Sequence, residues 1–191
     1  MSRASRRLAA FARGLMAVLI VALAACGGGG GGGGGPTAPP PPPPPPPPGI
    51  VFTAQGTATA NSISLASGAG TTANTLILEV RATQVTDLYG VAFDLAYPNT
   101  ALQFVRATPG QLLANGSVQA VPSTPGTLVV GGTHLGNVAG ANGSGVVMTL
   151  EFSALAAGSG NLAFSRNTAF DSDGDSMAGV GWVAGSVTVT R

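Results

Sequence analysis

Short runs in which apolar and polar residues alternate constrain this chain more than any other feature. In residues 75–82, Leu76, Leu78 and Val80 alternate with Ile77, Glu79 and Arg81. Successive side chains of a β-strand point to opposite faces, so the pattern predicts a strand with one buried face. Similar apolar or alternating runs recur at residues 91–97, 101–105, 127–130, 146–152, 161–164 and 186–190.

These runs are separated by Gly, Asn, Pro and Ser, and no window after residue 50 combines a helical period with a cap. Eight or nine short strands at close spacing predict an all-β, antiparallel two-sheet sandwich. Residues 50–191 are long enough to bury a core between two sheets. Only 8% of the chain is charged, which agrees with a secreted all-β protein.

The first 25 residues predict a signal peptide. Four arginines lie within residues 1–13, and an apolar run follows at residues 15–23. A helix needs about 20 apolar residues to span a bilayer, so this run is too short for a transmembrane anchor. A basic segment before a short apolar run is the pattern of a secretory signal.

The sole cysteine ends this segment. Leu23-Ala24-Ala25-Cys26 resembles the lipobox of bacterial lipoproteins, which implies that Cys26 is diacylated and becomes the mature N-terminus. The alternative is an ordinary signal followed by a chance cysteine, which could form no internal disulfide. Gly27 replaces the aspartate that retains many lipoproteins at the inner membrane. We therefore expect a lipid anchor in the cell envelope, at the outer membrane or cell surface.

Residues 26–49 read as a disordered linker. Nine glycines follow Cys26, and ten prolines occupy residues 39–48. The glycines predict a flexible coil, whereas the prolines predict a polyproline II segment of roughly 30 Å at about 3.1 Å per residue. Such a linker would hold the domain of residues 50–191 away from the membrane.

Charge argues against nucleic acid as a partner. The chain has no lysine, and after Cys26 four arginines stand against seven acidic residues, which leaves a net charge of about −3. Nucleic-acid binding needs clustered basic side chains to neutralise phosphates.

A family resemblance emerges from the order of several weak motifs. Asp87-Leu88-Tyr89-Gly90 leads into the run at 91–97 and then into Leu102-Gln103-Phe104-Val105. Gly143-Ser144-Gly145 leads into the run at 146–152, and Gly185-Ser186-Val187 opens the last run. This succession resembles the cohesin domain family over nearly all of residues 75–191. The chain departs from it at Tyr97-Pro98-Asn99, where members often have an aspartate-proline pair.

The resemblance implies a jelly-roll sandwich of about nine strands that binds and does not catalyse. Cohesins hold dockerins, small calcium-loaded helical domains on secreted proteins that are often polysaccharide-degrading enzymes. One sheet provides the gripping face, and the matching residues here are Ala92, Asp94, Ala96, Thr133 and His134. Asp94 could equally be a solvated strand residue. We expect a monomeric module with a protein partner.

Calcium is the one cofactor for which the sequence contains candidate ligands. Asp171, Asp173 and Asp175 alternate around Gly174, and carboxylates so arranged can ligate a hard cation. The spacing does not fit an EF-hand, which needs glycine at position six and glutamate at position twelve. The alternative is a plain Asp-Gly turn between two strands.

Other functions find less support. His134 is the only histidine, no G-x-S-x-G elbow is present, and too few ligands remain for zinc, so we expect no enzyme. We read His134 as an exposed loop residue. The alternative to a protein partner is a carbohydrate-binding or adhesive module, in which Tyr89, Tyr97 and Trp182 would stack on polysaccharide.

Overall fold

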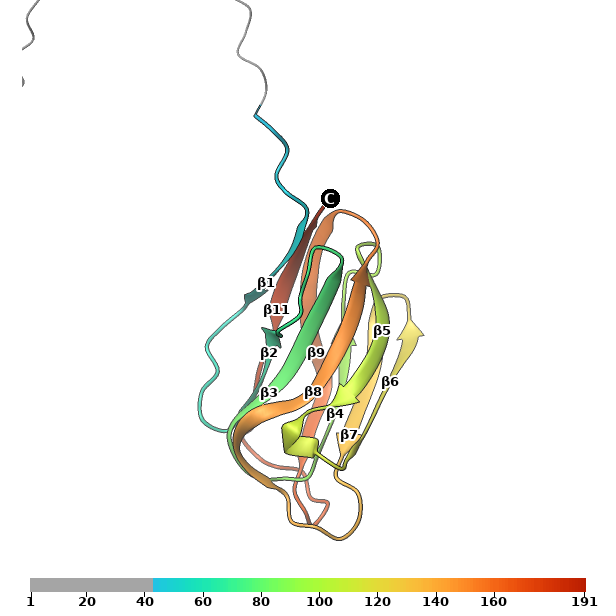
Figure 1. Ribbon diagram of the computed structural model, residues 1–191. Coiled ribbons are helices and arrows are strands. Elements are labelled where there is room, and N and C mark those ends of the chain that lie inside the picture. The colour runs from blue at the N-terminus through green and yellow to red at the C-terminus, as the bar shows by residue number, and fades with distance from the viewer. Residues whose placement is uncertain (1–42) are drawn as a thin grey trace, which may run out of the picture. The chain divides into compact units, whose positions relative to one another are not determined.

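The computed structural model describes residues 43–191, and these form two β-sheets packed face to face (Figure 1). Residues 43–48 are exposed and belong to no strand. Pro44–Arg191 is one compact unit with its own core. The predicted signal peptide, Cys26 and most of the predicted linker lie outside the described residues.

The first sheet has six strands, all paired antiparallel. Their order is β1 (Gly49–Ala54), β11 (Gly185–Thr190), β9 (Gly158–Phe170), β4 (Gly90–Ala96), β7 (Thr127–Thr133) and β6 (Ser117–Thr124). Because β1 pairs with β11, the chain enters and leaves this sandwich at the same end (Figure 1).

The second sheet has five strands. Their order is β10 (Gly181–Val183), β2 (Ser62–Ser67), β3 (Thr75–Leu88), β8 (Ala141–Ala154) and β5 (Leu102–Pro109). All neighbours are antiparallel except β10 and β2, which run parallel. A single 3₁₀ turn, η1 (Gln111–Leu113), follows β5.

The predicted all-β sandwich is confirmed, with more strands than the sequence indicates. Each alternating run overlaps a strand of the structure, and β3, β8 and β9 extend well beyond the predicted runs. The additional strands are β1, β2, β6 and the three-residue β10. In β2, Ile63 and Leu65 do alternate with serines, whereas β6 contains Pro122 and β10 has only three residues, so pairing with neighbours defines those two strands.

The core fills the space between the sheets with the alternating residues of both. Leu76, Leu78 and Val80 of β3 are fully buried, as are Met148, Leu150 and Phe152 of β8. The six-stranded sheet contributes Phe93 and Leu95 among others. Trp182, Phe164 and Phe93 pack together, with the Phe164 and Trp182 ring centroids 5.0 Å apart. This core fixes which face of each strand points outward.

The strands β3 and β8 bend together at one end of the sandwich (Figure 1). Their register shifts at several points beyond Val80, and Gln84 and Asp87 adopt positive φ. Bulges of this kind increase twist and re-aim the chain. They bring the end of β3 beside the β7–β8 and β9–β10 loops. Among residues 43–191, no helix is long and apolar enough to cross a membrane.

Candidate functional site

The outer surface of β9, β4, β7 and β6 gathers most of the predicted binding residues. Across the β4–β7 pair, Ala92 lies opposite Gly131, Asp94 opposite Val129, and Ala96 opposite Thr127. Thr133 lies opposite Gly90 one step further along. The sheet therefore brings Ala92, Asp94, Ala96 and Thr133 onto one surface, which we call the β4–β7 face.

Two exposed aliphatic side chains lie side by side on the β4–β7 face. Val129 on β7 is 42% exposed, and its cross-strand partner Val121 on β6 is 58% exposed. Leu135 follows β7 in the next loop and is also exposed. Large apolar side chains grouped on a surface mark sites of interaction with other molecules.

Of the two alternatives for Asp94, the solvated strand residue is wrong. Asp94 is only 6% exposed, because the side chain of Arg166 on β9 covers it. Arg166 Nε donates to Asp94 Oδ2 at 2.6 Å, and Nη2 donates to the same oxygen. The guanidinium itself remains largely in solvent. The one carboxylate of the β4–β7 face is thus neutralised within the sheet.

The outer surface of the five-stranded sheet has a different character. Arg81 pairs with Glu79 at 2.6 Å, and Arg106 pairs with Glu151 at 2.7 Å, all on β3, β5 or β8. This surface carries two ion pairs, whereas the β4–β7 face carries one, and the cores of protein interfaces are depleted of charged residues. The β4–β7 face is the better candidate for binding a protein.

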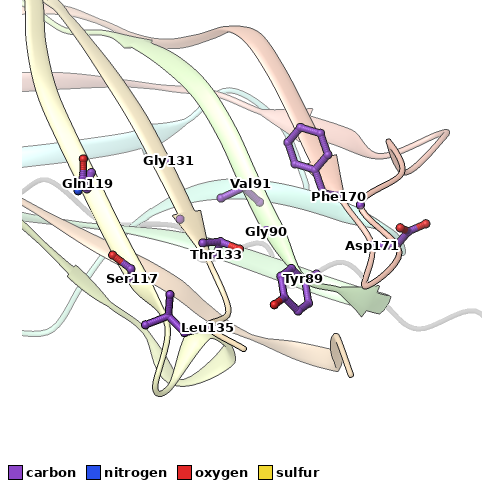
Figure 2. A pocket seen from close by; sticks show the side chains of 12 residues that line it. Tyr89, Gly90, Val91, Ser117, Gln119, Gly131, Thr133, Leu135, Phe170 and Asp171 are labelled. Carbon is purple, nitrogen blue, oxygen red and sulfur yellow. The ribbon is translucent and has the colours of Figure 1, made fainter. Parts of the chain in front are cut away.

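A groove of about 630 Å³ opens at one end of the β4–β7 face (Figure 2). Its floor is formed by strand backbone at Gly90, Gly131 and Gly132. The side chains around it come from five different parts of the fold: Ser117 and Gln119 of β6, Thr133 of β7, Leu135 of the β7–β8 loop, Tyr89 between β3 and β4, and Phe170 and Asp171 at the end of β9. Most of the exposed lining surface is apolar, and Ser117, Gln119, Thr133 and Asp171 contribute polar groups.

His134 departs from the exposed loop position expected for it. Its backbone N–H donates to the Tyr89 carbonyl at 2.9 Å, and the ring centroids of the two residues are 5.6 Å apart. The side chain is half-buried, and Nε2 is buried without a hydrogen-bond partner among the described residues. Tyr89 Oη in turn donates to the Gly136 carbonyl. His134 thus contacts Tyr89, which lines the groove, and does not line the groove itself.

Asp87 ties together the loops at that end. Its Oδ1 accepts from the N–H of Gly140 at 2.9 Å, and its Oδ2 accepts from the hydroxyl of Ser172 at 2.8 Å and from the Ser172 N–H at 3.3 Å. The backbone N–H of Asp87 donates to Asn142 Oδ1 at 3.0 Å. The hydrogen bond from the Ser172 hydroxyl, with those from the two backbone N–H groups, lowers the pKa of Asp87.

The Asp171 loop forms a turn stabilised by its own carboxylate. Asp171 Oδ1 accepts from the N–H groups of Asp173 at 3.2 Å and Asp175 at 2.9 Å. Gly174, at φ +85°, closes the turn by donating to the Asp171 carbonyl. No three His, Cys, Asp or Glu side chains of residues 43–191 form a group that could hold a metal. The three aspartates therefore form no such group, and calcium binding stays a prediction.

The three aromatic residues proposed for sugar stacking do not form an exposed row. Trp182 packs on Phe164, Tyr97 packs on Phe152 with centroids 5.2 Å apart, and Tyr89 lies over His134. A carbohydrate platform needs several aromatic faces open to solvent side by side, and these three occupy separate places.

The sequence model described as Cohesin domain matches residues 59–189, which include the β4–β7 face and the groove. The chain belongs to the cohesin domain family. Cohesin domains are non-catalytic binding modules, so this domain is not an enzyme. The resemblance that rested on the motifs from Asp87 to Val189 is confirmed. No curated protein matches the chain.

Solved cohesins share the fold at low sequence identity. A non-cellulosomal cohesin from Archaeoglobus fulgidus is 20% identical, with a TM-score of 0.55, over 67% of this chain and 89% of that one. A type II cohesin domain from the cellulosome of Acetivibrio cellulolyticus is 15% identical, with a TM-score of 0.56, over 68% and 95%. A type II cohesin–X–dockerin complex from the same organism matches at 18% identity and a TM-score of 0.55, over 63% and 93%.

Several residues of this cohesin's face are not apparent from the sequence. Val121 and Gln119 lie on β6, whose alternating pattern is interrupted by Pro122 and the neighbouring Ser and Thr residues. A weak signal exists, because Val118 and Ala120 turn toward the core while Gln119 and Val121 face outward. Arg166 and Gly131 carry no local signal, since their importance depends on which strands lie beside them.

Proposed function

We propose that this cohesin holds a partner protein on its β4–β7 face and that the partner is a dockerin-type module. The observation that carries the proposal is the exposed pair Val121 and Val129 on a face whose one carboxylate, Asp94, is neutralised by Arg166. Such a surface loses little on desolvation and gains from apolar burial. Support also comes from the structural neighbour that is a cohesin–X–dockerin complex.

The experiment is a binding assay between Pro44–Arg191 and purified dockerin modules that are encoded in the same genome. Substituting Val129→Glu places a charge at the centre of the face and should abolish binding. Val51→Glu is the matched control, because Val51 is 60% exposed on β1, at the far edge of the same sheet. Equal binding by both variants would contradict the assignment of the face, and absence of binding to every dockerin would remove the dockerin proposal.

We also propose that the cohesin is tethered to the cell envelope through a lipid on Cys26. The proposal rests on the basic and apolar leader, the sole cysteine and the glycine and proline run that follows. A tethered binding module would gain reach toward a bulky partner, and stable anchoring needs the two acyl chains of a lipoprotein cysteine. Outer-membrane or surface display follows from Gly27 in place of a retention aspartate.

Labelling the full chain with radioactive palmitate in a bacterial host tests the tether. Wild type should carry the label and sediment with membranes, whereas Cys26→Ser should carry none. A labelled Cys26→Ser protein, or an unlabelled wild type that is secreted free, would contradict the anchor.

A further inference from the structure

Gly131 sits where a strand ordinarily carries a side chain. It is the fifth residue of β7 (Thr127–Thr133), paired with Ala92 of β4 on one side and Gln119 of β6 on the other. A glycine within a strand weakens it, because it costs backbone entropy and packs nothing. The fold should therefore require glycine here for some reason of backbone or packing.

Neither reason applies to Gly131. It lacks a positive φ, and a Cβ built on it meets no atom within 4 Å. Its neighbours differ, because a Cβ on Gly132 would lie 2.6 Å from Met148 Cε and one on Gly90 would lie 3.0 Å from the Gly132 carbonyl. Among the glycines of the described chain that lack a positive φ, Gly131 is alone in having no atom within 4 Å of a Cβ. The space above it is left open by the fold itself.

That space is part of the groove, and Gly131 lies beneath it. Figure 2 shows Gly131 between the side chain of Gln119 and the strand of Val91, with Thr133 and Leu135 further along. A strand glycine without an internal role marks a place where another molecule approaches the backbone closely. The groove is also continuous with the proposed interface, since Val129 lies two residues before Gly131 on the same face of β7.

We infer that the groove over Gly131 receives a bulky apolar side chain of the partner protein, such as leucine or phenylalanine. The inference rests on the proposed function and names its anchoring contact. Interfaces draw most of their binding energy from a few large side chains that fill pockets near exposed apolar surface. Phe170 and Leu135 supply apolar walls, and the bare backbone at Gly131 lets the side chain enter to full depth.

The lining argues against a charged occupant. Asp171 is the one ionisable carboxylate among the lining residues, and its Oδ1 accepts two backbone N–H groups of its own loop. Burying a charged side chain on the glycine floor would cost free energy, because the lining has no basic side chain to pair with an anion and its one carboxylate is engaged within its own loop. An aliphatic or aromatic anchor meets no such cost.

A first test needs no identified partner. Isotope-labelled Pro44–Arg191 is titrated with N-acetyl-leucinamide, with N-acetyl-glutaminamide and with cellobiose, while amide NMR shifts are recorded. We expect saturable shifts at Gly131, Gly132 and Thr133 with the leucine probe, and weaker or no shifts with the other two. Equal shifts with the glutamine probe, a preference for cellobiose, or no shifts with the leucine probe would overturn the inference.

A second test fills the groove from within. Gly131→Val adds a side chain whose Cβ has no atom within 4 Å and which points outward from the sheet, so the variant should fold, which its amide spectrum verifies. Thr127→Val is the matched control at the other end of the same strand face. Gly131→Val should abolish the leucine-probe shifts. It should also weaken binding of any dockerin that binds wild type by about tenfold or more, which is the effect of losing an anchoring side chain. Thr127→Val should retain both the shifts and the affinity.

These outcomes separate the inference from the proposed function. If Val129→Glu abolishes dockerin binding and Gly131→Val does not, the face stands and the anchor in the groove is wrong. If no dockerin binds but the leucine probe occupies the groove, the dockerin proposal fails while the apolar preference of the groove stands.

Discussion

Arg166 on β9 closes over the carboxylate of Asp94 on β4, with Nε at 2.6 Å from Oδ2. A register shift in the β4–β9 pair permits this contact, because Ala92 pairs with Thr168 while Asp94 pairs with Ser165. The extra residue bulges from β9, and Arg166 takes a φ of +48°. Bulges re-aim side chains in this manner. The contact makes the centre of the β4–β7 face electrically neutral.

Removing the arginine should change binding more than stability. Arg166→Ala uncovers Asp94 and leaves a bare carboxylate beside Val129. Because the guanidinium is largely in solvent, we expect a loss of about 1 kcal/mol or less in the free energy of unfolding, measured by urea titration. Partner affinity should fall more, since the carboxylate must then be desolvated unpaired.

The double variant Asp94→Asn/Arg166→Ala provides the control for charge. It removes both charges and should recover much of the affinity that Arg166→Ala loses. If the double variant binds as weakly as the single one, the shape of the arginine side chain and not its charge governs binding.

Asp87 should make the stability of the loops at the end of the groove depend on pH. Its pKa lies below the ordinary value of 3.8 because Ser172 and Gly140 donate hydrogen bonds to the charged form. The charged form is therefore favoured by folding. Its stabilising contribution is complete above the unfolded pKa and is lost as pH falls through the lower, folded pKa. Asp87→Asn should have a lower Tm than wild type at pH 7, and the difference should shrink below about pH 4.

Hydrogen exchange locates this effect. In Asp87→Asn at neutral pH, the amides of Gly140 and Ser172 should exchange faster while those of the β3–β8 core remain protected. Asp173→Asn is the control, because the Asp173 side chain makes no hydrogen bond within the described residues. A pH dependence of Tm that is identical in wild type and Asp87→Asn would contradict the role assigned to Asp87.

Two glycine-to-alanine substitutions should have opposite effects on stability. Gly131→Ala meets no atom within 4 Å, and replacing a strand glycine should stabilise the domain by about 0.5–1 kcal/mol. Gly110→Ala places Cβ 2.3 Å from the carbonyl oxygen of Val146, a backbone atom that cannot yield, and should cost about 3 kcal/mol. Thermal unfolding of both variants checks the pair. A destabilised Gly131→Ala would show that the strand needs its glycine for folding.

The fluorescence of Trp182, which belongs to the aromatic cluster of the core, reports on the packing around it. Phe93→Ala removes a ring 5.9 Å from Trp182, the sole tryptophan, and should cost about 4 kcal/mol because a cavity remains. Tryptophan emission should shift to longer wavelength as water gains access to Trp182. Val51→Ala, at an exposed site, should leave emission and stability unchanged. An unshifted emission in Phe93→Ala would contradict the packing of Trp182 on Phe93.

Much of the fold could be predicted because alternation reports directly on burial. The run at residues 75–82 became the first half of β3, with its leucine and valine positions buried as expected. The same logic failed for β6, where Pro122 and polar residues at the sheet edge mask the period. It also missed the far half of β3, where register shifts at Val80, Ala82 and Val85 break the alternation.

The sequence by itself determined the strand character, the direction in which alternating residues face, and the family. A backbone period of two is local, so it can be read along the chain. Only the tertiary structure decided that Arg166 covers Asp94, that Val121 lies beside Val129, and that the space over Gly131 is open. Those facts depend on register, bulges and the order of strands within a sheet. Packing between segments far apart in the chain sets all three, and no local pattern encodes them.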